Sequence, residues 1–422
     1  MESSDALDIS SIRSRYARIR GMTKTLAAPL DPEDAALQSM PLASPAKWHL
    51  GHTSWFFEAF VLARAPRFEP YDQRYASLFN SYYEAMGPRH PRERRGLLSR
   101  PTLAEVLAYR QSVDERMEEL FARLAEMGDS RSFLALVRLG LEHEQQHQEL
   151  LLTDVLHLFS LNPLEPTYRP PQHLSRGGPA PALRWQSHPE GLFETGDRGG
   201  DFAYDNERPA HRVHLQAFDI ASRLVTNGEY LAFIEDRGYE RPELWLSDGF
   251  ALASAEGWKA PLHWRQRQGQ WATFTLRGLL PLAPEAPVTH VSFYEADAFA
   301  RWYGARLPTE QEWERVASEM PVRGNFLDDG RLLPSVASAS SAPSQLFGDT
   351  WEWTQSPYVP YPGFRPLPGA LGEYNGKFMC NQMVLRGGSC LTPEGHVRPS
   401  YRNYFPPSAR WQMTGIRLAR SS

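Results

Sequence analysis

A proline-rich stretch near the middle of the chain separates two parts with different sequence patterns. Residues 161–185 contain six prolines and two glycines, which is the composition of a linker. Before this stretch, apolar residues recur at helical spacing; after it, short β-like runs such as 211–218 and 384–386 alternate with Gly/Pro turns. We therefore predict a helical domain over residues 1–165, a linker over 166–184, and an irregular α+β domain over 185–422.

The first part has four segments with helical spacing, at 9–27, 44–65, 101–127 and 131–159. The second begins with Ser-Pro-Ala at residues 44–46, where Ser44 can cap a helix that has Pro45 in its first turn. Four helices, two of them long, indicate a four-helix bundle. The long connection at 71–100 is a candidate functional loop, because long connections in compact domains are often functional. In the second part, we expect helices at 226–237 and 294–304.

Charge and composition exclude several classes of protein. The chain has 45 basic and 50 acidic residues, a net charge of −5, whereas a general nucleic-acid binder needs a concentrated basic surface. Its two cysteines, Cys380 and Cys390, cannot form a disulfide framework or a cysteine-rich zinc module. No run of about 18 apolar residues could span a membrane, and the N-terminus lacks the apolar region of a signal peptide. We therefore expect a cytoplasmic protein without membrane or nucleic-acid partners.

The fourth segment contains the string EHEQQH at residues 142–147. His143 and His147 are four residues apart, so they lie on one face of a helix, where two imidazoles can hold one metal ion. The string also matches the H-E-x-x-H signature of zinc proteases, with Glu144 as the general base. The extended form of that signature requires Gly and His where this chain has Leu150 and Thr153, which argues against a protease.

A third ligand can come from the second segment, which contains WHLGHTSWFFE at residues 48–58. His52 follows Gly51, which would let a facing helix come close; His49 is the competing candidate. Two histidines from one helix and one from another leave coordination positions open. Such a site suits Fe(II) oxygen chemistry or catalytic zinc, and the three imidazoles do not decide between these metals.

These strings carry a resemblance to a known family. WHLGHTSWFFE, FNSYYEAMG and LEHEQQHQELLLTD resemble the N-terminal DinB-like bundle of the ergothioneine-pathway sulfoxide synthases. The second part resembles their C-terminal domain, which has the formylglycine-generating-enzyme fold related to C-type lectins, at RPAHRVHLQAFDIASRLVTNGEYLAFI, PVTHVSFYEADAFARWYGARLPTEQEWE, FGDTWEWTQS, VLRGGS and RPSYRNYFPPSARWQMTGIRLAR. The resemblance covers nearly the whole chain. It implies a non-haem Fe(II) enzyme that uses O2 to join a cysteine thiol to the imidazole of hercynine (Nα-trimethylhistidine), giving a sulfoxide.

The resemblance also implies roles for individual residues. It makes His52, His143 and His147 the iron ligands and leaves His49 a structural role. Four further residues would contact hercynine: Gln146 and Asn403 at its imidazole, and Tyr404 and Phe405 near its trimethylammonium group. A quaternary ammonium cannot donate hydrogen bonds, so aromatic faces hold it by cation–π attraction. Without the resemblance, Tyr404 and Phe405 would be interpreted as ordinary core aromatics.

The chain departs from the better-known branch of the family at three places. Where members that use γ-glutamylcysteine carry an Asp and an Arg, this chain has Phe405 and Ala409, which points to free L-cysteine as the thiol. Where that branch has a catalytic tyrosine in the loop before the VLRGGS strand, the resemblance places Leu371, with Tyr374 nearby. The chain instead has adjacent tyrosines in its 71–100 connection, as a second branch does. Finally, Cys390 has no partner cysteine after its strand, so formylglycine-generating oxidase activity is not expected.

Two expectations remain, one for the residues that bind the cysteine substrate and one for the residue that supplies a proton or hydrogen atom to oxygen. Among the arginines of 89–100, Arg92 and Arg95 are the candidates for binding the carboxylate of cysteine, because guanidinium groups bind carboxylates best. Either Tyr82 or Tyr83 is expected to deliver a proton or hydrogen atom to oxygen at the metal. An ovothiol-type synthase that couples cysteine to histidine, and a carbohydrate-binding or scaffold protein, are the alternatives. The oligomeric state is left open.

Overall fold

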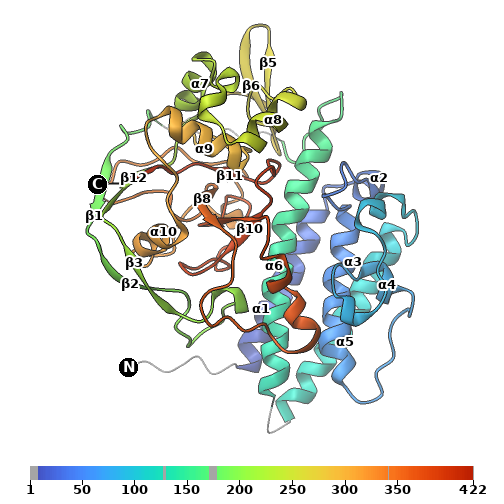
Figure 1. Ribbon diagram of the computed structural model, residues 1–422. Helices are drawn as coiled ribbons and strands as arrows, with labels where there is room; N and C mark the ends of the chain where they lie inside the picture. The colour runs from blue at the N-terminus through green and yellow to red at the C-terminus, as the bar shows by residue number, and fades with distance from the viewer. Residues whose placement is uncertain (1–7, 127–129, 171–177, 341, 422) are drawn as a thin grey trace. The chain divides into compact units, whose positions relative to one another are not determined.

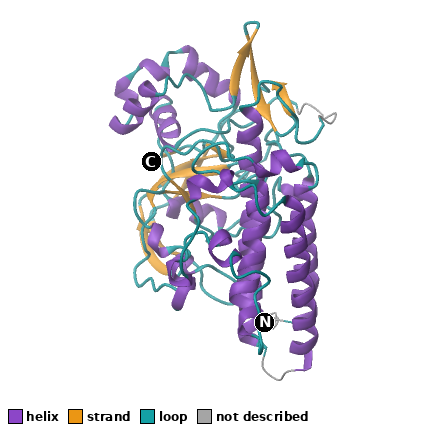
Figure 2. Ribbon diagram, turned by 90° about the vertical axis from the view of Figure 1, so that its right-hand side faces the viewer, coloured by secondary structure: helices purple, strands orange, loops and turns teal. Residues whose placement is uncertain are grey.

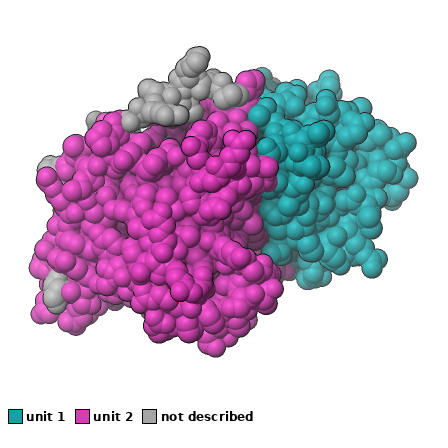
Figure 3. Space-filling view, turned by 90° about the horizontal axis from the view of Figure 1, so that it is seen from above, with its two compact units in different colours: residues 1–168, 199–202, 367–374 teal, residues 169–198, 203–366, 375–422 magenta. Residues whose placement is uncertain are grey.

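The computed structural model describes residues 8–126, 130–170, 178–340 and 342–421. The chain forms two compact units (Figure 3). Unit 1 comprises Met1–Tyr168 together with Gly199–Phe202 and Leu367–Tyr374; unit 2 comprises Arg169–Arg198, Ala203–Pro366 and Asn375–Ser422. Most of the predicted linker is described, but its residues 171–177 lie outside the described part, as does the predicted end of the third helix at Met127. No helix in the described ranges is long and apolar enough to cross a membrane.

Unit 1 is built on four helices, which confirms the predicted bundle (Figures 1 and 2). They are α1 (Ile9–Ala27), α3 (Ala46–Phe56), α5 (Leu103–Glu126) and α6 (Arg131–Ser160). α1 packs against α5 and α6, and α3 packs against the same two helices. α3 continues as a π-helical turn, Phe57–Val61, and a 3₁₀ turn, Leu62–Arg64. Shorter elements are α2 (Pro32–Ala36), α4 (Tyr75–Phe79) and the 3₁₀ turns Glu84–Met86 and Arg92–Leu97.

The start of α3 differs from its prediction by one position. Pro45, and not Ser44, occupies the N-cap, and no side chain caps this helix end. Ser44 instead donates its backbone N–H to Asp154 Oδ2 over 2.8 Å. Its hydroxyl accepts a hydrogen bond from Arg95 Nη1 at 2.9 Å. The sequence pattern failed here because residues distant in the chain take the hydrogen bonds that a cap would use.

Two glycines let aromatic rings approach the bundle helices closely. A Cβ atom at Gly51 of α3 would lie 2.1 Å from the ring of Phe79 at the end of α4. A Cβ atom at Gly140 of α6 would lie 2.7 Å from the ring of Phe57. Both distances are far below van der Waals contact, so any larger residue would displace the ring. The expected close approach at Gly51 is confirmed, and the partner is α4.

Unit 2 combines small sheets with short helices. The main sheet has the order β10-β9-β8-β11, with β11 parallel to β8 and the other pairs antiparallel. Its strands are β8 (Trp351–Pro357), β9 (Met383–Arg386), β10 (Asn403–Phe405) and β11 (Thr414–Gly415). The other sheets are β1-β4-β12 (Trp185–His188, Phe218–Ala221, Ala419–Ser421), β2-β3 (Gly191–Thr195, His211–Leu215) and β5-β6-β7 (Trp264–Arg267, Gln270–Thr275, Gly278–Pro281).

The helices of unit 2 are α7 (Asn227–Glu235), α8 (Ser247–Ala255), α9 (Phe293–Trp302) and α10 (Glu310–Ala317). The two predicted helices are confirmed as α7 and α9, whereas α8 and α10 were not predicted. α7 begins at Asn-Gly because Thr226 and Glu229 form a capping box that satisfies its first N–H groups. The predicted strand at 211–218 is in fact two strands, β3 and β4, in different sheets. The remaining 3₁₀ turns are Asp205–Glu207, Gly238–Glu240, Pro242–Leu244, Leu327–Asp329, Gly369–Glu373 and Gly376–Phe378.

Candidate metal centre

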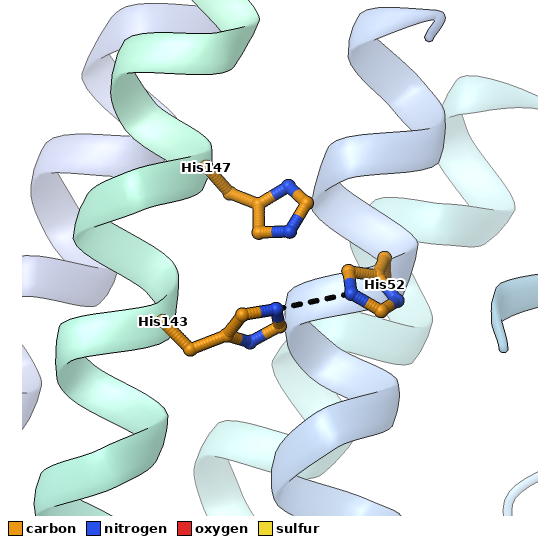
Figure 4. Close-up of side chains that lie close together, drawn as sticks. All are labelled: His52, His143 and His147. Atoms are coloured by element: carbon orange, nitrogen blue, oxygen red, sulfur yellow. Dashed lines mark hydrogen bonds between the residues drawn. The ribbon is translucent and has the colours of Figure 1, made fainter. Parts of the chain in front are cut away.

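Three buried histidines meet between two bundle helices (Figure 4). His52 comes from α3, and His143 and His147 come from one face of α6. One ring nitrogen from each histidine can be chosen so that all three lie within 4.8 Å of one another. His52 Nε2 and His143 Nε2 are 3.1 Å apart. The described residues thus contain one group of three side chains arranged to hold a single metal ion.

The backbone near His52 sets the orientation of its ring. His52 Nδ1 lies 2.6 Å from the carbonyl oxygen of Phe79, which is a hydrogen-bond acceptor. His52 therefore donates Nδ1–H to this oxygen, which leaves the Nε2 lone pair directed at His143. Phe79 can lie this close because Gly51 has no side chain. The adjacent residues Gly51 and His52 therefore act together: Gly51 leaves room for Phe79, and the Phe79 carbonyl orients the His52 ring.

All three imidazoles are held in the neutral form that binds metals. Burial is the main cause that lowers the pKa of His143, to about 3. Burial also lowers the pKa of His52 and His147 well below its usual range, with further contributions from neighbouring histidines and from Arg95. A neutral ring keeps a lone pair for coordination.

The donor set fits a metal ion with open positions. Ligand nitrogens about 2.1 Å from one metal lie about 3.0 Å apart at a right angle and about 3.4 Å apart at the tetrahedral angle. The separation of 3.1 Å between His52 Nε2 and His143 Nε2 falls in this range. Three imidazoles suit several divalent first-row metals, and they leave coordination positions for substrates.

His49 lies outside this cluster but contacts it. His49 Nδ1 is 2.8 Å from His147 Nδ1, and His49 Nε2 is 3.2 Å from Asp154 Oδ2. His49 is buried, and burial lowers its pKa despite the nearby carboxylate. The His49 ring therefore lies next to His147, on the side of His147 that faces away from His52 and His143.

Glu144 points into a separate network on the other side of α6. Its Oε1 accepts hydrogen bonds from Thr23 Oγ1 and Arg110, and its Oε2 accepts one from Arg20. Burial alone would raise the pKa of Glu144, but Arg110 and Arg20 hold it at about 2. A carboxylate that is ionised near neutral pH and bound by two arginines is not available as the general base of a zinc protease, which argues against a hydrolase.

Tyr374 reaches the cluster from a distant part of the sequence. It follows the 3₁₀ turn Gly369–Glu373 and belongs to unit 1. Its hydroxyl donates a hydrogen bond to Gln146 Oε1, and its ring centroid is 5.6 Å from that of His143. Glu373 accepts hydrogen bonds from the backbone N–H groups of Glu84 and Ala85, which ties this turn to the 71–100 connection. Leu371, which the resemblance places at the catalytic tyrosine of the other branch, lies in the same 3₁₀ turn, and its aliphatic side chain cannot donate such a hydrogen bond.

The two predicted tyrosines face different surroundings. The ring of Tyr82 is half-buried and lies edge-on to Tyr374, with 6.1 Å between centroids. Tyr83 is fully buried, and its ring packs among Trp55, Phe56 and Phe60 of α3 and the π-helical turn that follows it. Tyr82 therefore lies nearer than Tyr83 to the Gln146–Tyr374 pair.

Arg95 is a buried cation beside the histidines. Its guanidinium lies 3.3 Å over the ring of Trp48, which in turn stacks on His52 with 4.6 Å between centroids. It donates to the hydroxyls of Ser44 and Ser81 and makes no ion pair among the described residues. Burial and Arg92 lower the pKa of Arg95 to about 8. Arg92 is exposed and donates to the carbonyl of Leu42.

The remaining predicted residues belong to unit 2. Asn403, Tyr404 and Phe405 form β10, and all three are half-buried. Tyr404 stacks on Tyr358 with 4.0 Å between centroids, and the ring of Phe405 packs against Trp411. These contacts are those of packed aromatic residues. A role for the three residues at hercynine continues to rest on the resemblance.

Comparison with known proteins agrees with this architecture. Residues 15–151 match the DinB superfamily, and residues 187–334 and 342–422 match the sulfatase-modifying factor enzyme 1-like domain. Hercynine oxygenase from Mycolicibacterium smegmatis is 35% identical to this chain, over 92% of the chain and 94% of that protein. The chain belongs to the hercynine oxygenase family. Hercynine oxygenase from Mycolicibacterium thermoresistibile is 34% identical, over 92% of this chain and 91% of that protein.

Membership of the hercynine oxygenase family confirms the resemblance to the ergothioneine-pathway sulfoxide synthases, and with it the predicted fold class and an oxygenase-type enzyme. The second half of the chain is also similar to the formylglycine-generating enzyme of Streptomyces coelicolor, with 30% identity over 57% of this chain and 89% of that protein. In this chain Cys390 is buried and Cys380 is exposed, and neither forms a disulfide.

Sequence reasoning missed the contacts of Asp154 and gave Tyr374 only a secondary place. No spacing rule connects Tyr374 with Gln146, because 228 residues separate them. Asp154 lies on α6 seven residues after His147, two helical turns along the same face. That periodicity was a usable signal that Asp154 lies on the helix face that carries the histidines.

Proposed function

We propose that this enzyme uses Fe(II) and O2 to couple L-cysteine to the imidazole of hercynine, giving hercynylcysteine sulfoxide. The observation that carries the proposal is the buried His52–His143–His147 cluster with Gln146, Tyr374 and Arg95 around it. Relatives of matching length are named hercynine oxygenases, which supports hercynine as the acceptor.

The overall reaction balances without an external reductant. Forming the C–S bond removes two electrons from the thiol and imidazole, and oxidising the sulfur to a sulfoxide removes two more. O2 accepts four electrons; one oxygen atom enters the sulfoxide and the other leaves as water. Bound Fe(II) would supply the position at which thiol and O2 meet, held by His52, His143 and His147.

Arg95 is the proposed anchor for the carboxylate of cysteine. A buried guanidinium without a carboxylate partner is costly, and a substrate carboxylate would remove that cost. Its two hydroxyl partners and the face of Trp48 hold the group beside His52 while leaving its charge uncompensated. Arg92 is a weaker candidate, because it is exposed and donates to a backbone carbonyl.

Gln146 is the proposed partner of the hercynine imidazole. Its side-chain oxygen lies on the same face of α6 as His143 and His147, one turn from the first. An amide oxygen has two lone pairs, so it can accept from an imidazole N–H as well as from Tyr374. This shared acceptor would place the phenol next to the ring that is being substituted.

A phenol at this position can direct the reaction toward C–S bond formation. Sulfur oxidation alone would give a sulfinate, so a proton or hydrogen atom must be delivered at the correct stage. Tyr82 and Tyr374 are the better-placed donors, because their rings contact each other and Tyr374 contacts His143. We assign Tyr83 to packing, since aromatic side chains surround its ring.

Free cysteine is the proposed thiol because Phe405 and Ala409 replace the acid and base of the branch that uses γ-glutamylcysteine. Ala409 is buried and Phe405 packs against Trp411, so neither position offers a charge to a glutamyl group. Asn403, Tyr404 and Phe405 keep their proposed roles at hercynine from the family pattern.

The test is product analysis with the full chain reconstituted anaerobically with Fe(II). Hercynine, cysteine and O2 should give a product with the mass of the sulfoxide, and kcat/KM should be higher for cysteine than for γ-glutamylcysteine. Preference for the dipeptide would overturn the choice of thiol. Conversion of histidine in place of hercynine would indicate an ovothiol-type enzyme, and no coupled product with any pair would contradict the proposal.

A further inference from the structure

The hydrogen bonds of the three clustered histidines differ on the side away from the cluster. His52 Nδ1 donates to the carbonyl of Phe79. His143 Nδ1 is buried and has no hydrogen-bond partner among the described residues. His147 Nδ1 contacts His49 Nδ1 at 2.8 Å, and His49 Nε2 contacts Asp154 Oδ2 at 3.2 Å. Only His147, within this group, has its outer nitrogen connected to a carboxylate.

The Asp154 end of this chain of contacts fixes the position of each hydrogen. Carboxylate oxygens accept hydrogen bonds, and Asp154 Oδ2 already accepts one from the Ser44 N–H. His49 therefore donates Nε2–H to Asp154, and a neutral His49 then has a lone pair at Nδ1. That lone pair accepts Nδ1–H of His147, so the lone pair of His147 is at Nε2.

We infer that His49 and Asp154 form a positioning pair that fixes the tautomer and ring orientation of His147 and makes it a stronger metal ligand. A carboxylate bonded through an intermediate ring raises the basicity of the coordinating nitrogen, and outer partners of this kind hold the ligand ring in place. The inference rests on the proposed metal site, and it assigns His49 a role in metal binding without direct coordination.

The positions of the two residues on α3 and α6 hold His49 next to Asp154. Asp154 lies two turns after His147 on α6, and His49 lies about one turn before His52 on α3. The Ser44 N–H holds Asp154 from the start of α3, the position at which the expected helix cap is missing. His49, Ser44 and Asp154 are all buried, so water does not compete for these hydrogen bonds.

The test measures Co(II) binding to the full chain by competition and by the visible absorption of the bound ion. His49→Phe keeps a ring but removes both nitrogens, and Co(II) affinity should fall by about 10–100-fold with a shifted absorption band. His49→Asn should recover most of the affinity, because its amide oxygen is as many bonds from Cα as the lost Nδ1. His214→Phe is the control: it makes the same change at an exposed histidine of β3 whose Nδ1 contacts Gln216, and it should bind Co(II) like wild type.

His52→Ala distinguishes failure of the proposed metal site from failure of the inferred His49–Asp154 pair. If wild type and His52→Ala bind Co(II) equally weakly, the metal site itself is wrong and the inference fails with it. If His52→Ala loses binding while His49→Phe keeps wild-type affinity and absorption, only the inference is overturned. Equal losses in His49→Phe and His49→Asn would also overturn it. Should His49→Phe not fold, Asp154→Asn, which keeps an oxygen for the Ser44 N–H, should weaken Co(II) binding; unchanged affinity would refute the pair.

Discussion

The two sides of α6 bury polar groups in opposite ways. Glu144 is fully buried and paired with Arg20 and Arg110. His143, one residue earlier, is equally buried, but its Nε2 meets another imidazole nitrogen and its Nδ1 has no partner among the described residues. Arg95, on the same side as the histidines, has no carboxylate. One side of the helix, the complete side, pairs its buried charges within the protein; on the other, the open side, imidazole rings face one another and Arg95 makes no ion pair among the described residues.

The difference separates structural from functional polar residues. The complete side connects the helices, because Arg110 bonds Thr53 of α3 as well as Glu144 of α6. Thr53 and Glu144 each follow a candidate ligand directly in the sequence. Unit 2 has the same complete type of cluster, in which Glu310 accepts from both Arg386 and Arg402. Burying polar groups without partners is unfavourable, and the proposed metal and cysteine carboxylate would supply partners on the open side of α6.

The largest effect is expected from His52→Ala, which removes the α3 member of the open side. Two histidines of one helix remain, and metal content and sulfoxide formation should both be lost. Metal analysis after anaerobic loading checks this result; a stoichiometric metal content in the variant would contradict the ligand assignment.

The next largest effect is expected from removing a phenol on the open side. Tyr82→Phe or Tyr374→Phe keeps the ring and removes the hydroxyl, and general-acid assistance of this kind contributes about 10²–10⁴-fold. We expect one of the two variants to lose most sulfoxide formation while oxidation of cysteine alone persists or rises. Tyr83→Phe is the control and should resemble wild type. Product ratios decide, and wild-type sulfoxide yield in both test variants would eliminate this role.

Glu144→Gln should break the complete side and reduce stability. Removing one partner of a buried ion pair costs about 3–5 kcal/mol, because Arg20 and Arg110 then remain underpaired. The pKa of Glu144 is lowered from 4.5 to about 2, so its contribution is present above pH 4.5 and is lost as the pH falls toward 2. The difference in unfolding free energy between wild type and variant should therefore shrink over that window. Denaturant unfolding at several pH values measures it; a difference independent of pH would argue against the ionised pair.

Arg95→Met should have the smallest effect on the folded protein and a selective effect on the thiol. It replaces a buried, uncompensated charge by an apolar chain of similar length, so stability should stay the same or rise. Hydrogen bonds to a charged group contribute about 1.5–3 kcal/mol, which corresponds to a rise of about 10–150-fold in the KM for cysteine. The KM for hercynine should not follow. Steady-state kinetics with each substrate varied in turn distinguishes this outcome from a general loss of activity.

Local patterns in the sequence were sufficient for the helices of the bundle and for its histidines. The spacing of His143 and His147 follows from helical periodicity, and α1 and α6 agree with prediction to within one residue at each end. The cap at Ser44 and the single strand at 211–218 were wrong for a common reason. Both depend on which distant residues take the backbone hydrogen bonds, and a local pattern contains no such information.

The ligand types, the four-helix unit and the family are thus properties of the sequence, because periodicity and motifs act over a few residues. The environment of those ligands depends on the tertiary structure. Packing decided that Glu144 pairs with arginines, that Tyr374 bonds Gln146, and that Arg95 makes no ion pair among the described residues. These contacts join residues between 34 and 228 positions apart. Burial and electrostatic pairing depend on the whole fold, and they separate the residues that hold this protein together from those proposed to bind its substrates.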